Sequence, residues 1–411
     1  MQTRPFFALT ILCGFIAGNT LGQGTAGEAL ERGPLQVGEV VEQQFDTAHP
    51  YSGLGTKGFQ RISSQEIHLP GATYVAPHFS RFELAPGDYV IARSPDNRRS
   101  WRYERYGKGE LGKTDGFWGI HVPGDRMVLE LYSRGFNQGF GYTVDRVARG
   151  SVSIYPVPEA ICGADDADWA QCYIDTEPEV YEEARAVARL LIQGTGLCTG
   201  WLVGDEGHLF TNNHCISTAA AAANTNFEFM AEGACGEFCG QLQCPGDVVT
   251  TMSTLIQTNS TMDYTLLLLD TNPTATYGFI QLRETGPVVG ERIYIPQHPS
   301  GNGKRIALES TDSHDPTGFA QLDQILPGAG ILGTYYADTS GGSSGSPVLA
   351  YDDHCAVILH QGTFGCAGAG NAGNVVDQII TDLGSNLPNS ALCSADSIFA
   401  DGFESGNTNA W

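Results

Sequence analysis

The feature that most constrains this chain is a glycine-rich turn around a serine, in residues 338–347 (DTSGGSSGSP). Glycines before and after Ser344 let the backbone turn sharply and expose one hydroxyl group. His214 lies upstream of the turn, and Asp263 lies between the two, at the head of the apolar run 264–269. The order histidine, aspartate, serine along the chain restricts which folds can bring the three side chains together.

These residue types suit acyl transfer to a serine, which needs a base, an oriented carboxylate and backbone donors for an oxyanion. We predict that His214 is the base, that Asp263 orients it and that Ser344 is the nucleophile. The amides of Gly342 and Ser344 are the predicted oxyanion hole. Glycine at 342 matters because it lets the turn aim both amides inward.

The start of the chain predicts export. Residues 5–17 are nearly all apolar, follow Arg4 and lead into small residues near 22–26. Such a run is too short for a membrane-spanning helix and is typical of a secretory signal peptide, expected here over residues 1–24. The residue before Cys13 is not the small one that a lipid-anchoring motif requires. A secreted protein of bacterial type is therefore expected.

The cysteines support the same compartment. The sequence has 11 cysteines, and ten remain after Cys13 is removed with the signal peptide. An even number in an exported chain predicts disulfides. Cys235, Cys239 and Cys244 have no paired histidines nearby, so neither a metal site nor a cofactor is predicted.

Charge is distributed unevenly along the chain. Residues 1–149 hold 16 basic and 15 acidic side chains, whereas residues 150–411 hold 6 basic and 31 acidic ones. A strongly acidic second part disfavours nucleic acid and anionic membranes as partners, although it can equally serve only to keep the protein soluble. A monomer without nucleic-acid or membrane partners is expected.

A length of 411 residues predicts more than one core. Residues 25–158 carry short alternating runs, such as 89–92 and 127–132, separated by turn signals such as Pro-Gly-Asp at 86–88. This spacing predicts a β-sandwich-like N-terminal domain. No cysteine lies between residues 25 and 160, so a disulfide from this part to the rest is not expected.

Residues 159–390 are expected to form a second domain, also all-β, followed by a tail over 391–411. Short helices are predicted near 218–224 and 375–383, and the apolar run 187–192 fits either a helix or a buried strand. Strands are predicted at 200–203, 264–269, 292–295 and 347–349.

The second domain resembles the chymotrypsin-fold, or trypsin-like, serine endopeptidases, most closely the bacterial lysyl and glutamyl endopeptidase branches. The resemblance covers roughly residues 162–384 and implies two perpendicular β-barrels, with the active site between them, acting on proteins or peptides. It rests on the segments CTGWLV at 198–203, NHC at 213–215, MDYTLL at 262–267, GSSGSP at 342–347, and His298-Pro299 followed by Lys304-Arg305-Ile306.

The resemblance also implies a disulfide framework. It pairs Cys198 with Cys215 and Cys162 with Cys366. Cys172 would pair with one of Cys235, Cys239 or Cys244. The resemblance does not assign the remaining bridges, for which we suggest Cys355 with Cys393.

The N-terminal sandwich resembles the propeptides of these enzymes, which implies that it acts as an intramolecular inhibitor or chaperone. Vertebrate digestive enzymes place an aspartate just before the nucleophile to capture a newly cut N-terminus, and Ser343 stands at that position here. That switch is not expected. Cleavage between Arg149 and Cys162 is the predicted activating step.

Specificity has two interpretations. Asp338 precedes Ser344 by six residues, where trypsin carries the carboxylate that binds lysine or arginine. Thr339 and His360, with Gly362 as a further substrate-binding position, fall where glutamyl endopeptidases hold a substrate carboxylate. The lysyl branch shares the histidine. The aspartate that this branch uses further downstream is replaced in this chain, near Asn374 or Val375. We favour cleavage after lysine or arginine, with a glutamyl endopeptidase as the alternative.

Two other classes of function compete with a protease. An esterase of the α/β-hydrolase type is disfavoured because Ser346 replaces the second glycine of its nucleophile turn and the order of the three residues differs. A catalytically inactive binding module on a protease fold is the remaining alternative; such proteins usually lose one of the three residues, and all three are present here.

Overall fold

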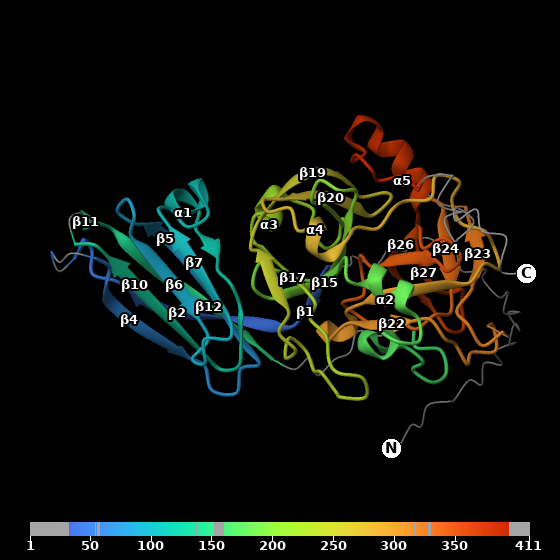
Figure 1. Ribbon diagram of the computed structural model, residues 1–411, viewed down its shortest axis with the longest axis horizontal. Coiled ribbons are helices and arrows are strands. Elements are labelled where there is room, and N and C mark those ends of the chain that lie inside the picture. Colours follow the sequence, from blue (N-terminus) through green and yellow to red (C-terminus); the bar gives the residue numbers. More distant parts are fainter. Residues whose placement is uncertain are drawn as a thin grey trace, which may run out of the picture. The chain divides into compact units, whose positions relative to one another are not determined.

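The computed structural model describes residues 33–393, except for 54, 56–57, 136–137, 152–159, 316 and 328–329. The predicted signal peptide and nearly all of the predicted tail lie outside the described residues. Strands make up most of the regular secondary structure of the described part, and its helices are short (Figure 1). The all-β fold class is therefore confirmed.

The N-terminal part is a sandwich of two antiparallel sheets that share one core. Alternate residues of one strand, Met127, Leu129 and Leu131, face Phe79 and Phe82 of the other sheet, as expected for strands with one buried face. The first sheet has the order β2 (Gly38–Asp46), β12 (Gly141–Gly150), β5 (Tyr74–Glu83) and β8 (Phe117–Trp118), with β9 (Val122–Pro123) also on β5. The second has the order β4 (Gln60–His68), β10 (Arg126–Ser133), β6 (Tyr89–Arg93) and β7 (Ser100–Glu104). Smaller elements are β3 (Tyr51–Ser52) paired with β11 (Gln138–Gly139), and α1 (Glu110–Thr114).

The second part begins with a sheet that carries the predicted histidine and aspartate. The run 187–192, ambiguous in sequence, is a buried strand that follows helix α2 (Pro178–Ala184). The sheet order is β18 (Asp247–Thr250), β17 (Thr225–Phe229), β14 (Val187–Ile192), β15 (Gly196–Val203), β16 (His208–Thr211), β20 (Tyr264–Leu269) and β19 (Ser253–Asn259). The two-residue strand β1 (Leu35–Gln36), which precedes the sandwich, pairs with β15. Helix α3 is Ala219–Ala222.

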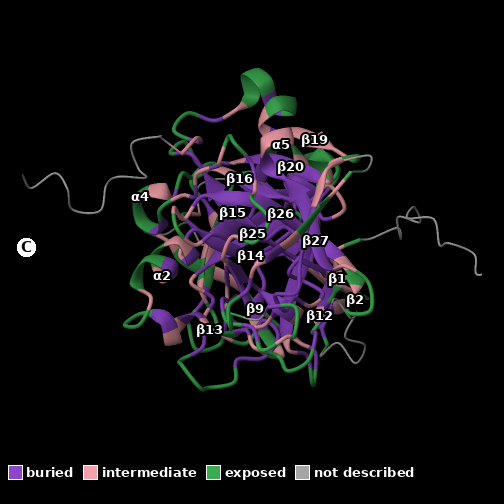
Figure 2. Ribbon diagram, turned by 90° about the vertical axis from the view of Figure 1, so that its right-hand side faces the viewer, coloured by how far each residue is buried: buried purple, intermediate pink, exposed green. Residues whose placement is uncertain are grey.

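The last sheet carries the predicted serine turn between two of its strands. Its order is β13 (Asp168–Trp169), β22 (Arg305–Ala307), β21 (Ile293–Gln297), β25 (Pro347–Ala350), β26 (Ala356–Gly365), β27 (Gly370–Val375), β24 (Leu332–Tyr335) and β23 (Leu322–Leu326). The remaining helices are α4 (Thr274–Tyr277), α5 (Val376–Leu383) and the 3-10 turns η1 (Ala170–Tyr173), η2 (Pro299–Gly301) and η3 (Gly384–Asn386). Figure 2 shows that the central strands are buried, whereas much of α2 and α4 is exposed.

Five disulfides join the described cysteines, all within residues 162–393. Cys198 pairs with Cys215 and Cys162 with Cys366, as the resemblance implies. The partner of Cys172, which the sequence left open, is Cys235. The others are Cys239–Cys244 and Cys355–Cys393.

A buried ion cluster joins the sandwich to the first sheet of the second part. Glu228 of β17 accepts two hydrogen bonds from Arg189 of β14, at 2.8 and 3.1 Å, and a further one from Arg99 of the sandwich. Burial alone would raise the pKa of Glu228, but the charges of Arg189 and Arg99 lower it well below its usual range. Removing one partner of such a buried cluster would leave an uncompensated charge, which is costly.

An apolar cluster lies beside these charges. Val37, Tyr74 and Trp118 of the N-terminal part pack with Leu191 and Leu197 of the second part. The Tyr74 hydroxyl also donates to the Gly194 carbonyl oxygen over 2.8 Å. The sandwich therefore covers β14 and β15 with both apolar and polar groups.

Candidate active site

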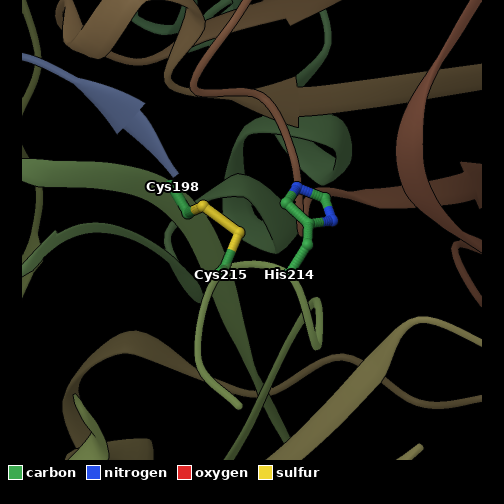
Figure 3. Close-up of side chains that lie close together, drawn as sticks. All are labelled: Cys198, His214 and Cys215. Carbon is green, nitrogen blue, oxygen red and sulfur yellow. A yellow bond between two sulfur atoms is a disulfide. The ribbon is translucent and has the colours of Figure 1, made fainter. Parts of the chain in front are cut away.

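The position of His214 is set by the first sheet of the second part. Strand β16 ends at Thr211, and the chain turns so that His214 projects from the loop after it. The Cys198–Cys215 disulfide ties this loop to β15, as Figure 3 shows. The cross-link limits where the His214 backbone can move.

The aspartate meets the histidine because their strands are neighbours. Thr211 of β16 pairs with Thr265 of β20, so the ends of both strands lie together. One carboxylate oxygen of Asp263 is 2.7 Å from His214 Nδ1, and the other accepts the His214 backbone N–H over 2.9 Å. Asp263 has a φ of +44°, an unusual value for a residue with a side chain. Asn212 holds this turn by donating to the Asp263 carbonyl oxygen over 2.9 Å.

The serine turn is held against β15. Thr199 donates its backbone N–H to the Ser344 carbonyl oxygen and its hydroxyl to the Gly342 carbonyl oxygen, both over 2.9 Å. Gly342 and Gly345 have φ values of +99° and +89°, which favour glycine. A Cβ on Gly345 would lie 2.2 Å from the Thr199 carbonyl oxygen, so a side chain there does not fit. Thr199 was not singled out from the sequence, although it lies in the matched segment 198–203.

Histidine 360 lies on β26 beside the serine turn. Its backbone N–H donates to the Ser346 carbonyl oxygen over 2.9 Å, and its carbonyl oxygen accepts from Gly345 N–H over 3.0 Å. The buried His360 ring places Nδ1 2.7 Å from the Tyr335 hydroxyl. Gly362 lies two residues further along β26.

Asp338 is held by the backbone at the start of the second part. Its two carboxylate oxygens accept the N–H groups of Cys162 and Asp166 over 3.0 and 2.7 Å. Burial raises the pKa of Asp338 to about 6, although these two hydrogen bonds act in the opposite direction. The neighbouring Thr339 hydroxyl is buried without a hydrogen-bond partner among the described residues. Asp338 and Thr339 both line a small pocket with Ile161, Asp165, Ala167, Gln297, Pro299, Arg305 and Ser340.

The Asn371 side chain, which sequence reasoning missed, also holds the start of the second part. The Asn371 amide accepts Ala160 N–H over 3.1 Å and donates to the Ala160 and Ala337 carbonyl oxygens over 2.8 and 2.7 Å. With the Cys162–Cys366 disulfide, Asn371 and Asp338 hold the backbone of residues 160–166. No local pattern marks Asn371, because its partners lie more than 200 residues away and 34 residues away. Asn374 and Val375, where the lysyl branch's aspartate is replaced, lie at the end of β27.

The cysteine sulfurs next to His214 do not form a metal site. Cys198, His214 and Cys215 bring three potential ligand atoms within 4.8 Å of one another. The two sulfurs are bonded to each other, so neither is available as a thiolate.

The two sheets of the second part are those of an all-β, chymotrypsin-like protease fold. Residues 163–377 match the family described as lysyl endopeptidase, C-terminal domain. The chain belongs to this family. No helix in the described part of the chain has the length and apolar character needed to cross a membrane.

Individual proteins are similar to the chain over different lengths. Secreted RxLR effector protein 73 of Plasmopara viticola is 37% identical over 331 residues, which are 76% of this chain and 79% of that protein. A solved Glu endopeptidase in complex with MPD is 16% identical with a TM-score of 0.39, covering 55% of this chain and 98% of its own. The active form of the Rv3671c protease from M. tuberculosis is 13% identical with a TM-score of 0.38, covering 60% and 94%.

Proposed function

We propose that this protein is a serine endopeptidase in which His214, Asp263 and Ser344 form the catalytic triad. His214 takes the proton of the Ser344 hydroxyl as its oxygen attacks the substrate carbonyl, and then gives that proton to the leaving amine. Water then hydrolyses the acyl-enzyme by the same route. The amides of Gly342 and Ser344 stabilise the oxyanion. The observation that carries the proposal is the 2.7 Å contact between His214 Nδ1 and Asp263, because it holds the imidazole in the tautomer that a base needs.

The favoured substrates have lysine or arginine before the cleaved bond. Membership of the lysyl endopeptidase family supports this preference. Asp338 is the candidate residue for binding the cation. Each of its oxygens accepts one backbone N–H and keeps a further lone pair for an ammonium or guanidinium group.

A glutamyl endopeptidase is the second candidate. The buried Thr339 hydroxyl, which has no partner among the described residues, supports it because a substrate carboxylate could accept that hydrogen bond. In that case the His360 side chain would supply the positive charge that compensates the substrate carboxylate.

The N-terminal sandwich is proposed to inhibit the protease as an intramolecular propeptide. Along a strand, every second residue directs its backbone groups to the same edge. On one edge of β15, Leu197 pairs with Leu35 of β1, Thr199 bonds the Ser344 carbonyl, and Trp201 pairs with β16. Strand β1 therefore occupies the backbone positions next to the nucleophile turn, where an extended substrate could pair.

The processing scheme follows from this arrangement. A signal peptide over residues 1–24 directs secretion, cleavage between Arg149 and Cys162 separates the sandwich (25–158) from the protease (159–390), and residues 391–411 form a tail. The similarity to a secreted RxLR effector protein and the five disulfides among the described residues support export. The processed enzyme is proposed to act as a monomer.

A peptide library cut by processed protein tests the function, with Ser344→Ala as the blank. Cuts after lysine and arginine support the first specificity, and cuts after glutamate support the second. Labelling of Ser344 by a fluorophosphonate probe reports the activated serine separately. Folded, processed protein that neither cuts peptides nor reacts with the probe would be a binding module, and the protease proposal would be abandoned.

A further inference from the structure

We propose that the hydroxyl group of Ser346 is a positioning group for the oxyanion hole, acting through the carbonyl oxygen of Ser343. The inference rests on the serine endopeptidase function proposed above. Ser346 lies two residues after the nucleophile and touches neither substrate nor reacting atoms in that scheme. Its effect is on the direction of the Ser344 N–H.

The hydroxyl makes a short hydrogen bond inside the turn. Ser346 Oγ donates to the Ser343 carbonyl oxygen over 2.6 Å, and the Ser346 backbone N–H donates to the same oxygen over 2.9 Å. Both residues are fully buried. Two donors on one carbonyl oxygen fix its direction, because rotation of that peptide would break both bonds and leave buried groups unpaired.

The direction of the carbonyl sets the direction of the amide. Ser343 C=O and Ser344 N–H belong to the same peptide unit, and in a planar trans peptide they point to opposite sides. Holding the Ser343 oxygen towards Ser346 therefore aims the Ser344 N–H away from Ser346. That N–H is one of the two proposed oxyanion donors.

The second donor is held in the same manner from a different loop. The Ser300 backbone N–H donates to the Gly341 carbonyl oxygen over 2.7 Å. Gly341 C=O and Gly342 N–H again share one peptide, so this bond aims the Gly342 N–H away from Ser300. Ser300 has a φ of +56°, so the loop keeps an unusual backbone conformation at the point of contact. Each proposed oxyanion donor therefore belongs to a peptide whose carbonyl oxygen is fixed by a hydrogen bond.

The test replaces Ser346 with alanine, which removes the hydroxyl bond but keeps the backbone N–H bond to Ser343. Loss of a whole oxyanion donor costs about 10²–10³-fold in kcat, so loosening one donor is expected to lower kcat by about tenfold. The KM for a peptide substrate should stay within about twofold. The matched control is Ser253→Ala, which removes another buried serine hydroxyl that donates to a carbonyl, that of Ala222 at 3.1 Å, on β19.

Two inhibitors separate positioning from general damage. A peptide aldehyde, whose adduct with Ser344 carries an oxyanion, should bind Ser346→Ala about tenfold more weakly than wild type. The corresponding peptide alcohol, which forms no adduct, should bind both equally. The P1 residue of both compounds is the one found with the peptide library.

Three outcomes would overturn the inference. One is an unchanged kcat and aldehyde affinity in Ser346→Ala. Another is a parallel loss of aldehyde and alcohol affinity, which indicates damage to the site as a whole. The third is an equal loss in Ser253→Ala. If Ser346→Ala does not fold, Ser346→Cys is judged by the same criteria, because its thiol is a weaker donor of similar shape. An inactive, unlabelled wild-type enzyme would instead refute the proposed function itself.

Discussion

The backbone N–H of Thr199 donates to the carbonyl oxygen of Ser344 over 2.9 Å, so the serine turn lies directly against the edge of β15. Two residues earlier on the same strand, Leu197 pairs with Leu35. The first described strand of the chain and the proposed nucleophile are therefore next to each other on one edge. The inhibition proposed for the sandwich would then act through the pairing of β1 with β15 and would not depend on the bulk of the sandwich.

Replacing Leu35 with proline should activate the uncleaved chain. Proline removes the Leu35 N–H and with it one possible hydrogen bond between β1 and β15, worth about 1.5 kcal/mol. The initial rate of peptide hydrolysis by uncleaved protein should rise about tenfold. Gln36→Ala, which keeps the backbone donor of an exposed residue, is the control and should not change the rate. Equal rates for Leu35→Pro and wild type would show that β1 does not block the site.

Asp263→Asn should nearly abolish peptide hydrolysis without unfolding the chain. The asparagine oxygen can still accept the His214 backbone N–H, but its NH₂ then faces His214 Nδ1 and forces the proton onto Nε2. That tautomer cannot accept the serine proton, and kcat should fall about 10⁴-fold. Circular dichroism checks the fold. Asp382→Asn, which changes a carboxylate bonded to the Tyr264 hydroxyl at 2.5 Å, should retain activity. A comparable loss there would mean that the effect is not specific to Asp263.

Asp338 should make lysine preference depend on pH. Its pKa is raised to about 6, so the carboxylate becomes charged as pH rises through that value. The ratio of kcat/KM for a P1 lysine substrate to that for a neutral P1 substrate should therefore increase between pH 5 and pH 7. The ratio cancels the titration of the base, which both substrates share. Asp338→Asn should give a flat ratio, and a flat ratio in wild type would remove Asp338 from the binding of lysine.

The same carboxyl group should also affect stability. Between its ordinary pKa of 3.8 and about 6, the folded chain keeps a proton on Asp338 that the unfolded chain has lost. Its contribution to the free energy of unfolding should therefore decrease as pH rises through this window and stay constant above it. Urea unfolding of wild type and Asp338→Asn at pH 4 and pH 7 measures the difference. An equal pH dependence in the two proteins would contradict the raised pKa.

Arg99→Met should weaken the attachment of the sandwich to the protease. Leaving a buried charge wholly unpaired costs about 3–5 kcal/mol, but Glu228 keeps Arg189, so a loss of about 2 kcal/mol is expected. After cleavage between Arg149 and Cys162, gel filtration should show the two pieces separating at higher protein concentrations than in wild type. Arg102→Met removes the exposed pair with Glu104 and should have little effect. If the two pieces of Arg99→Met co-elute as those of wild type do, the apolar contacts alone are enough to hold the sandwich to the protease.

Much of the protease part follows from local sequence. The run 264–269 is a strand with these same limits because its side chains are almost all buried in the core. The segments 198–203, 213–215 and 342–347 also indicated which parts of the chain form the candidate site. In contrast, the run 187–192 could not be assigned until its pairing with β15 and β17 was known, since a fully buried strand lacks alternation.

Contacts between distant residues could not be read from the sequence. Strand β1 has only two residues and no pattern, and it forms because β15 offers an edge 160 residues later. Arg99 and Glu228 are ordinary surface-type residues whose burial depends on how the two parts meet. The direction of the Asp338 side chain depends on the backbone of residues 162 and 166, which no spacing rule reveals.

All the disulfides of the described residues lie within 162–393, and no cysteine occurs between residues 25 and 160. While the chain is intact, the sandwich faces the protease at a fixed, high effective concentration. After one cut between the sandwich and the protease, the sandwich becomes an ordinary ligand. The fraction of protease that it occupies then depends on its concentration. Dilution on leaving the cell would then complete an activation that cutting alone only begins.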